Sequence, residues 1–373
     1  MEPPYPGHAY ARTHPDHLAW LARLHALSPA DPDDCRVLEL ACGDGMNVIA
    51  MAAAAPGVRV TGVDLDGGAI ARGQAVVDEL GLAERVDLRV ADLTELPHLG
   101  PADYVICHGL YTWAPPRVAD AALAALAAHL APAGVGFLSF NLRPGWTVRR
   151  ALGPALANHG GDPRALLAAL EPALEDREDA YGQLLAAERR RLSDTTDALL
   201  VHDDLGPHTT AAWYSDVVAH ADHHGLRILR DAHPDTLRDG PVADQGLADL
   251  AWGQPYREVA LIPATAPASA QPSVDADALP VAPRRFATAP GERPLAYPLA
   301  RLQARESADV TTLRHTRLTI LDEVGRAILV ACDGTRSVSD LAAAFGAEVV
   351  AGALEQLAAN ALLLPAAPRS PAA

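Results

Sequence analysis

The residues best suited to ligand chemistry surround a glycine-rich turn. Glu39 lies in a short apolar stretch, the turn Cys42-Gly43-Asp44-Gly45 follows it, and Asn47 comes shortly after. Glycines at these positions let the backbone turn tightly and approach a ligand at the start of a helix. Because a buried carboxylate repels phosphate, Glu39 favours a ligand with a positive end, such as an amino group or a sulfonium.

Two more acids follow predicted strands. Asp64 stands about twenty residues after the turn and suits a ribose diol. Asp92 follows the next strand, where it could accept from the amine of an adenine. A dinucleotide motif would need its third glycine where Val48 stands. The set therefore predicts S-adenosylmethionine (SAM) as the cofactor, with S-adenosylhomocysteine (SAH) as its product, rather than NAD.

The residues predicted to contact SAM are Glu39, Ala41, Cys42, Gly43, Asp44, Gly45, Asn47, Asp64, Leu65, Asp92, Leu93 and His108. The residues predicted to be catalytic are His108, Tyr111 and Asn141. The residues predicted to line the substrate site are Tyr5, Tyr10, Trp113, Arg143 and His202. Each of the catalytic and substrate-site side chains could instead serve packing, capping or anchoring. Tyr5, Tyr10 and His14 could close over the SAM site as a lid.

Strands and helices alternate from residue 36 to residue 141, which indicates a parallel sheet covered on both faces. The predicted strands are 36–41, 58–64, 85–91, 103–107 and 135–141, and strands 226–231 and 256–263 complete the sheet. We therefore expect an α/β fold with a Rossmann-like seven-stranded sheet. The predicted parts are an arm (1–30), the SAM-binding core (31–146), a helical insertion for substrate or dimer contact (147–205), the completion of the sheet (206–263), a Pro/Ala-rich linker (264–296) and a C-terminal module (297–373).

The C-terminal module is predicted to be winged-helix-like. An extended region at 310–321 precedes helices at 322–332, 338–345 and 347–360, and Ser337 with Asp340 forms a capping box. From residue 297 on the module is about neutral, whereas DNA-reading modules are basic. We therefore expect a module that docks a peptide or protein, or one that only packs against the sheet.

Composition excludes several functions. The net charge is −17 and the chain contains no lysine, which argues against nucleic-acid binding and excludes P-loop and Schiff-base chemistry. The four cysteines (Cys35, Cys42, Cys107 and Cys332) show no metal-ligand spacing. No apolar run reaches the length of a membrane span and no basic leader opens the chain, so we expect a cytoplasmic protein without a membrane partner.

One histidine group has the spacing of a metal site. His220, His223 and His224 lie three and four residues apart on a predicted helix at 210–224. No second ligand set is evident in the sequence. The prediction is therefore a solvated helix face and no bound metal.

The turn, taken with Asp64 and Asp92, resembles the SAM site of class I SAM-dependent methyltransferases. More narrowly, the chain is similar to bacterial methyltransferases that carry a methyltransferase regulatory domain, a group associated with rickettsial-type protein-lysine methyltransferases. The segments that carry the narrower resemblance are Pro4-Tyr5-Pro6, Thr13-His14-Pro15, residues 108–115, Ser139-Phe140-Asn141, Pro144-Gly145-Trp146, residues 202–205 and residues 310–315. The resemblance implies methyl transfer to an amine of a peptide or protein, and a possible homodimer.

The chain also departs from the subgroup. Ala41 stands where glycine is usual, which is tolerable if the backbone there stays extended. Phe140, Leu142, Arg143 and Thr147 replace residues that are usual in the subgroup, with two hydroxyls and an imidazole lost. The alternatives are a small-molecule N- or O-methyltransferase of secondary metabolism and a SAM-binding regulator without catalysis.

Overall fold

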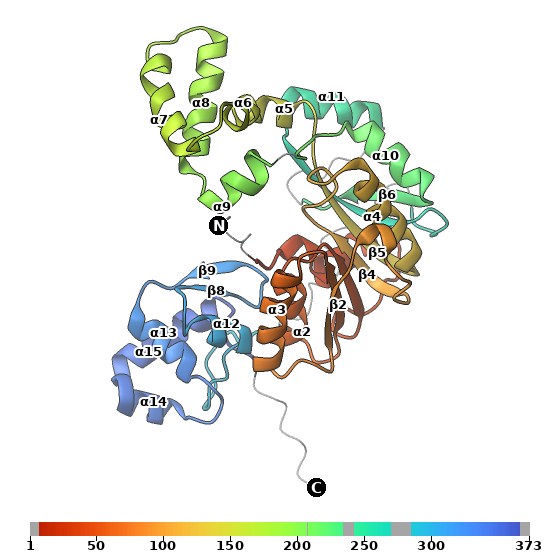
Figure 1. Cartoon of the computed structure of the whole chain (residues 1–373). Helices are drawn as coiled ribbons and strands as arrows, with labels where there is room; N and C mark the ends of the chain where they lie inside the picture. Colours follow the sequence, from red (N-terminus) through yellow and green to blue (C-terminus); the bar gives the residue numbers. More distant parts are fainter. Residues whose placement is uncertain (1–6, 207, 234–241, 270–284, 366–373) are drawn as a thin grey trace. The chain divides into compact units, whose positions relative to one another are not determined.

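The computed structural model describes residues 7–206, 208–233, 242–269 and 285–365. Its main sheet has seven strands in the order β3-β2-β1-β4-β5-β7-β6, which confirms the predicted seven-stranded sheet (Figure 1). The strands are β1 (Arg36–Leu40), β2 (Arg59–Asp64), β3 (Val86–Val90), β4 (Ala102–Cys107), β5 (Leu130–Asn141), β6 (Leu226–Asp231) and β7 (Tyr256–Pro263). The described chain divides into two compact units. The cofactor unit contains residues 7–24, 30–90 and 285–365, and the insertion unit contains 25–29 and 91–269.

In the cofactor unit, β1, β2 and β3 pair in parallel, so their carboxyl ends lie at one edge of the sheet. Helices α2 (Met46–Ala54) and α3 (Gly67–Glu79) follow β1 and β2. The Asp66 side chain accepts from the amides of Gly68 and Ala69 and so caps α3. The three strands predicted in this region are confirmed to within a residue at each end.

The N-terminal segment forms a short 3-10 helix, η1 (Ala11–Thr13), and helix α1 (Pro15–Leu24). The side chains of Leu18 and Leu21 on α1 are completely buried. Each such burial stabilises by about 1.5–3 kcal/mol. Arg285 pairs with the Asp16 carboxylate of α1. The segment is therefore anchored in the unit over its described length.

The C-terminal module has two strands and four helices among the described residues. They are α12 (Pro298–Gln303), β8 (Asp309–Thr311), β9 (Arg317–Thr319), α13 (Glu323–Ala331), α14 (Val338–Phe345) and α15 (Ala347–Ala359). The capping box of Ser337 and Asp340 is confirmed. Residues 310–321 form an antiparallel hairpin rather than one extended run, because the chain reverses at 312–316, where His315 has φ 60°.

The linker predicted at 264–296 is shorter at its C-terminal end. Ala296 pairs with Leu363, and Leu295 with Asp333, so both belong to the module. Residues 270–284 of the predicted linker lie outside the described residues. The module's core includes Ala50 of α2, and the buried Tyr297 hydroxyl donates to the Ala50 carbonyl at 2.6 Å.

In the insertion unit, β5 pairs in parallel with β4, and β7 pairs antiparallel with both β5 and β6. Helices α4 (Pro116–His129) and α10 (Tyr214–His223) accompany these strands. Helix α10 begins four residues later than predicted, since Trp213 caps it and Ala212 pairs with Leu142.

Helix α11 (Val242–Trp252) was not predicted. It supplies Asp249, which pairs with the buried Arg257 of β7 at 2.9 Å.

Between β5 and β6 lies the predicted helical region, with no strand among its described residues (Figure 1). Its elements are α5 (Gly145–Arg149), α6 (Gly153–His159), α7 (Pro163–Leu174), α8 (Ala180–Asp194), α9 (Asp197–Leu199) and the π-helical turn η3 (Leu200–Asp204). A leucine core of its own, which includes Leu167 and Leu192, holds it together. Arg191 pairs with both Glu188 and Asp204, so Asp204 is an ion-pair partner of the preceding helix. Among the described residues no helix is long and apolar enough to cross a membrane.

Replacing Tyr297 with phenylalanine tests the attachment of the C-terminal module to α2. The variant removes the hydroxyl that donates to the Ala50 carbonyl, so we expect the free energy of unfolding to fall by about 1–2 kcal/mol. Urea denaturation followed by circular dichroism measures this loss. Tyr181→Phe, at an exposed position on α8, is the control. Equal stability of the two variants would contradict the role given to the Tyr297 hydroxyl.

Candidate active site

Glu39 is the buried acid of the cofactor unit. It lies on β1 with 4% of its surface exposed, and its Oε1 accepts from Asn47 Nδ2 at 2.7 Å. Its Oε2 is buried and has no hydrogen-bond partner among the described residues. Burial, with a smaller contribution from the neighbouring Asp44 and Asp64, raises the pKa of Glu39 to about 8. The site therefore lacks one positive or donating group.

Asn47 holds Glu39 in place. It is buried on α2, and besides donating to Glu39 its Nδ2 donates to Thr13 Oγ1 at 3.0 Å. Its Oδ1 accepts from the Tyr10 amide at 2.9 Å and from His315 Nε2 at 3.1 Å. Asn47, predicted to contact SAM, thus has protein partners for its amide nitrogen and its oxygen.

His315 brings the C-terminal module into this network. Burial keeps its pKa well below the ordinary value, so the ring is neutral and its Nε2–H donates to Asn47. Its ring also packs edge-on against His14, with centroids 4.9 Å apart. In the sequence, His315 belongs to a segment that carries the subgroup resemblance, and its contact with Asn47 was not predicted. Its left-handed backbone conformation carries no signal in the sequence.

The glycine turn leaves its backbone open to a ligand. Gly43 has φ 60°, and a side chain there would meet nothing within 4 Å. Gly45 has φ 71° and caps α2, and its Cα faces Leu88 so closely that a Cβ would lie 2.7 Å from that side chain. The Gly43 amide donates to Asp64 Oδ2 at 2.7 Å. Gly43 is therefore required for its backbone angle, and Gly45 is required both for its backbone angle and for its close packing against Leu88.

Ala41 corrects one expectation. Its φ is 58°, so the backbone there is left-handed and not extended. An alanine in the left-handed conformation raises the free energy of the folded state by roughly 1–2 kcal/mol. The glycine that is usual at this position in the subgroup would avoid that cost.

Cys42 is not a reactive thiol. Its Sγ lies over Gly62, where an added Cβ would come within 2.8 Å of it. Burial raises the pKa of the Cys42 thiol far above its usual range.

Asp64 ends β2 with both oxygens oriented by backbone amides. Oδ2 accepts from Gly43 and Oδ1 from Asp66 at 2.8 Å. Burial raises its pKa. Next to it, Leu65 is 71% exposed, and Val90, which pairs in register with Asp64, is 58% exposed. These apolar side chains at two adjacent strand ends offer a surface that suits an aromatic base.

Asp92 and Leu93 begin the 3-10 turn η2 (Leu93–Glu95) that follows β3. Asp92 Oδ1 accepts from the Thr94 amide and hydroxyl, each at 2.8 Å. These hydrogen bonds lower the pKa of Asp92, so it is an ionised acceptor. Its predicted contact with adenine remains a prediction.

The N-terminal arm lies against the glycine turn. A Cβ on Gly7 would come within 2.2 Å of the Asp44 carboxylate, so a larger residue there would require the Asp44 side chain to shift. Asp44 Oδ1 also accepts from the Met46 amide at 3.0 Å. The backbone amide of Tyr10 donates to Asn47 Oδ1, while the predicted substrate-site role of its side chain stays a prediction. Tyr5 lies outside the described residues.

In the insertion unit, the residues predicted to be catalytic lie at the ends of β4 and β5. His108 Nδ1 lies 3.4 Å from the Tyr256 hydroxyl of β7. The Tyr111 hydroxyl lies 2.7 Å from His220 Nδ1, and burial raises the pKa of Tyr111 to about 12. Tyr111 is therefore a neutral phenol at neutral pH. Tyr256 was not predicted as a site residue, because nothing local in its strand distinguishes it.

Asn141 is completely buried at the end of β5. Its side-chain Nδ2 donates to the Thr210 carbonyl at 3.1 Å, and its backbone amide donates to Thr112 Oγ1 at 2.9 Å. Its Oδ1 has no partner among the described residues. An unpartnered buried acceptor costs about 1–3 kcal/mol, and a donor from a bound molecule would remove that cost.

The remaining predicted residues differ in their placement. Trp113 packs edge-on against Trp146 and Tyr256, with ring centroids 6.0 and 5.9 Å away. Arg143 is exposed at the end of β5. His202 lies in η3, within the helical region. Of the three, the structure places only Trp113 among the aromatic side chains near the strand ends.

Two family models match the chain. A methyltransferase domain matches residues 37–134, and the C-terminal winged helix domain of PKMT matches residues 292–362. The chain is 29% identical over 260 residues to the uncharacterized protein RP789 of Rickettsia prowazekii, which covers 67% of this chain and 47% of that protein. It is 27% identical over 240 residues to RP028 of the same organism, with 61% of this chain and 96% of that protein covered. The chain thus spans about half the length of RP789.

The solved structure of PKMT2 from Rickettsia typhi in complex with AdoHcy has the same fold. Its TM-score is 0.84 at 19% sequence identity, and the match covers 96% of this chain and 100% of that one. The chain therefore contains a methyltransferase domain and has the class I methyltransferase fold. The match to the C-terminal winged helix domain of PKMT confirms the predicted winged-helix module.

The cofactor unit fits SAM at three places. The unpartnered Glu39 Oε2 suits the positive amino group of the methionine part. Asp64 suits the ribose hydroxyls, and the exposed Leu65 and Val90 suit a face of the adenine ring. The open space at Gly43 leaves room for the ligand beside the backbone.

Replacing Asp64 with alanine tests the ribose contact. The variant loses the carboxylate that would accept from the diol, and hydrogen bonds to charged groups contribute about 1.5–3 kcal/mol. We expect SAM affinity, measured by isothermal titration calorimetry, to fall at least about tenfold. Asp78→Ala, which removes an exposed acid from the neighbouring α3, should leave it unchanged. Unchanged affinity in Asp64→Ala would refute the ribose assignment.

Proposed function

We propose that this protein transfers a methyl group from SAM to an amine of a peptide or protein. The observation that carries the proposal is the buried Asn141 Oδ1, which lacks a donor among the described residues. An amine has N–H groups to donate to such an acceptor, whereas a deprotonated hydroxyl has none. Asn141 would thereby orient the amine nitrogen for reaction.

Aromatic side chains near Asn141 support a cationic substrate. Trp113 packs edge to face against Trp146 and Tyr256, and the faces of such rings attract ammonium groups and their methylated forms. The Arg149 guanidinium already lies 5.2 Å over the Trp146 ring, so the rings proposed to meet a substrate amine are those of Trp113 and Tyr256. The net charge of −17 adds a long-range attraction for lysine-rich chains. The sequence resemblance to protein-lysine methyltransferases points to the same class of acceptor.

When bound, SAM supplies a methyl group on a positively charged sulfur, which is already an activated leaving group. The side chains of the protein then have to align the amine and take up its proton. Asn141 Oδ1 would fix the direction of an N–H bond. We propose His108 as the base, since Tyr111 is held as a neutral phenol and its pKa is far from neutral pH. The Tyr256 hydroxyl, near His108 Nδ1, would orient that imidazole.

The absence of lysine from this chain makes the test unusually clean. The protein is incubated with SAM and lysine-containing peptides and proteins, free amines and hydroxylated small molecules, and mass spectrometry follows the gain of one methylene per methyl group. We expect transfer to lysine side chains, and methyl-lysine in a digest can come only from the substrate. Transfer only to hydroxyls or small molecules would contradict the peptide-amine proposal, and SAM binding without any transfer would indicate a regulator.

Replacing Asn141 with leucine tests its role in catalysis. One hydrogen bond lost from the transition state corresponds to about a tenfold or greater fall in kcat. SAM affinity should be unchanged, which also shows that the variant is folded. Asn158→Leu, at an exposed position on α6, is the matched control. If both variants keep the wild-type kcat, Asn141 does not orient the acceptor.

A further inference from the structure

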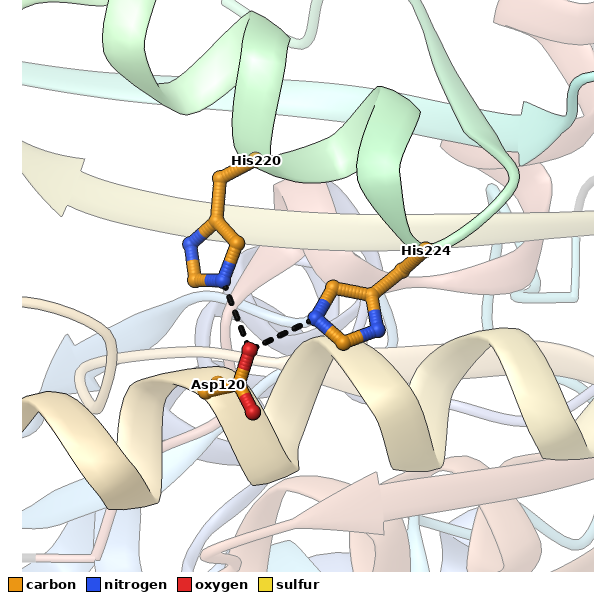
Figure 2. A group of neighbouring side chains, drawn as sticks. All are labelled: Asp120, His220 and His224. Atoms are coloured by element: carbon orange, nitrogen blue, oxygen red, sulfur yellow. Dashed lines mark hydrogen bonds and ion pairs between the residues drawn. The ribbon is translucent and has the colours of Figure 1, made fainter.

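Three side chains of the insertion unit direct their ligand atoms toward one point (Figure 2). Asp120 lies on α4, His220 lies on α10, and His224 is the C-terminal cap of α10. Asp120 Oδ1 is 3.0 Å from His220 Nε2 and 2.8 Å from His224 Nε2. All three ligand atoms lie within 4.8 Å of one another. The histidines were singled out by spacing in the sequence, and Asp120 is the further ligand that only the fold reveals.

We propose that Asp120, His220 and His224 bind a Zn²⁺ ion. Histidines four residues apart project from the same face of a helix, so both rings reach one ion. With Zn–N and Zn–O bonds of about 2.0–2.1 Å, tetrahedral geometry places ligand atoms roughly 3.3 Å apart. The two distances from Asp120 Oδ1 to the histidine nitrogens need to widen by only a few tenths of an ångström, and the two histidine nitrogens already lie within 4.8 Å of each other.

Tyr111 orients His220 for this role. Its hydroxyl oxygen lies 2.7 Å from His220 Nδ1. When Nδ1–H donates to that oxygen, the lone pair of Nε2 points away from Tyr111 and is free to bind a metal. Metal-binding histidines are commonly held in this way, with the second ring nitrogen donating to an oxygen.

Charge and access also favour a divalent cation. One carboxylate and two neutral imidazoles carry a single negative charge, and Asp216 adds another nearby, since it contributes with Asp120 to the raised pKa of Tyr111. The side chains of Asp120 and His220 are 57% and 27% exposed, so an ion can enter from solvent. Solvent can also provide the fourth ligand, as in sites with three protein ligands.

Zinc suits this ligand set because it is borderline in softness and takes both imidazole and carboxylate in tetrahedral geometry. A bound ion would join α4 to α10. Through His220 it would also hold the Tyr111 hydroxyl in place after β4. The site does not depend on the proposed methyl acceptor, and its binding is measurable without SAM.

The test uses the full chain without an affinity tag, stripped of metal by a chelator. Zinc is titrated in competition with a chromophoric chelator, and bound metal is counted by inductively coupled plasma mass spectrometry. We expect one zinc per chain, and visible d–d bands of tetrahedral Co²⁺ when cobalt replaces it. Asp120→Asn and His224→Ala should each weaken zinc affinity at least about tenfold.

His223→Ala is the matched control, because His223 lies beside His224 but is not one of the three ligands. It should bind zinc as the wild type does, and zinc should raise the melting temperature of both. Melting in the presence of chelator shows whether each variant is folded. The proposal is overturned if the wild type takes up no stoichiometric zinc, or if His223→Ala loses as much affinity as His224→Ala. If no zinc binds, the three side chains form only two imidazole–carboxylate hydrogen bonds.

Discussion

The hydrogen bond between the buried Glu39 carboxylate and Asn47 is the interaction on which the cofactor unit depends. Burying a carboxylate is costly unless it is paired, and here one oxygen is paired by Asn47 and the other has no partner among the described residues. The same unfavourable burial of the charged form raises the pKa of Glu39. A ligand with a positive end would remove it, so the fold is preorganised for such a ligand.

Asn47 also explains why distant segments belong to one unit. Its amide group contacts Thr13 and Tyr10 of the N-terminal segment and His315 of the C-terminal module. The winged helix domain is therefore joined by hydrogen bonds to the residue that positions Glu39. We infer that a change in the module, such as the loss of the His315 ring, would alter the cofactor site without touching the ligand.

The sheet, the glycine turn and the acids at the strand ends were predictable because they follow from local pattern. Apolar runs of strand length and glycines at turns leave a signal within a few residues. The contacts of Asn47 with His315, and of Asp120 with His220 and His224, join residues that are far apart in the chain. No local pattern reports such pairs. At Ala41 the local pattern was misleading. Alanine normally avoids the left-handed backbone conformation, so this residue was expected to be extended, but its φ is positive.

The most direct test of this account is the pH dependence of SAM affinity. Free Glu39 has a raised pKa of about 8, and the positive amino group of SAM would favour its charged form, so binding below that pH must release a proton. Calorimetry in buffers of different ionisation enthalpy should show this release, with affinity rising up to about tenfold per unit as pH increases toward 8. Glu39→Gln should bind more weakly and lose the pH dependence. Wild-type affinity that is independent of pH, or wild-type affinity in Glu39→Gln, would contradict the account.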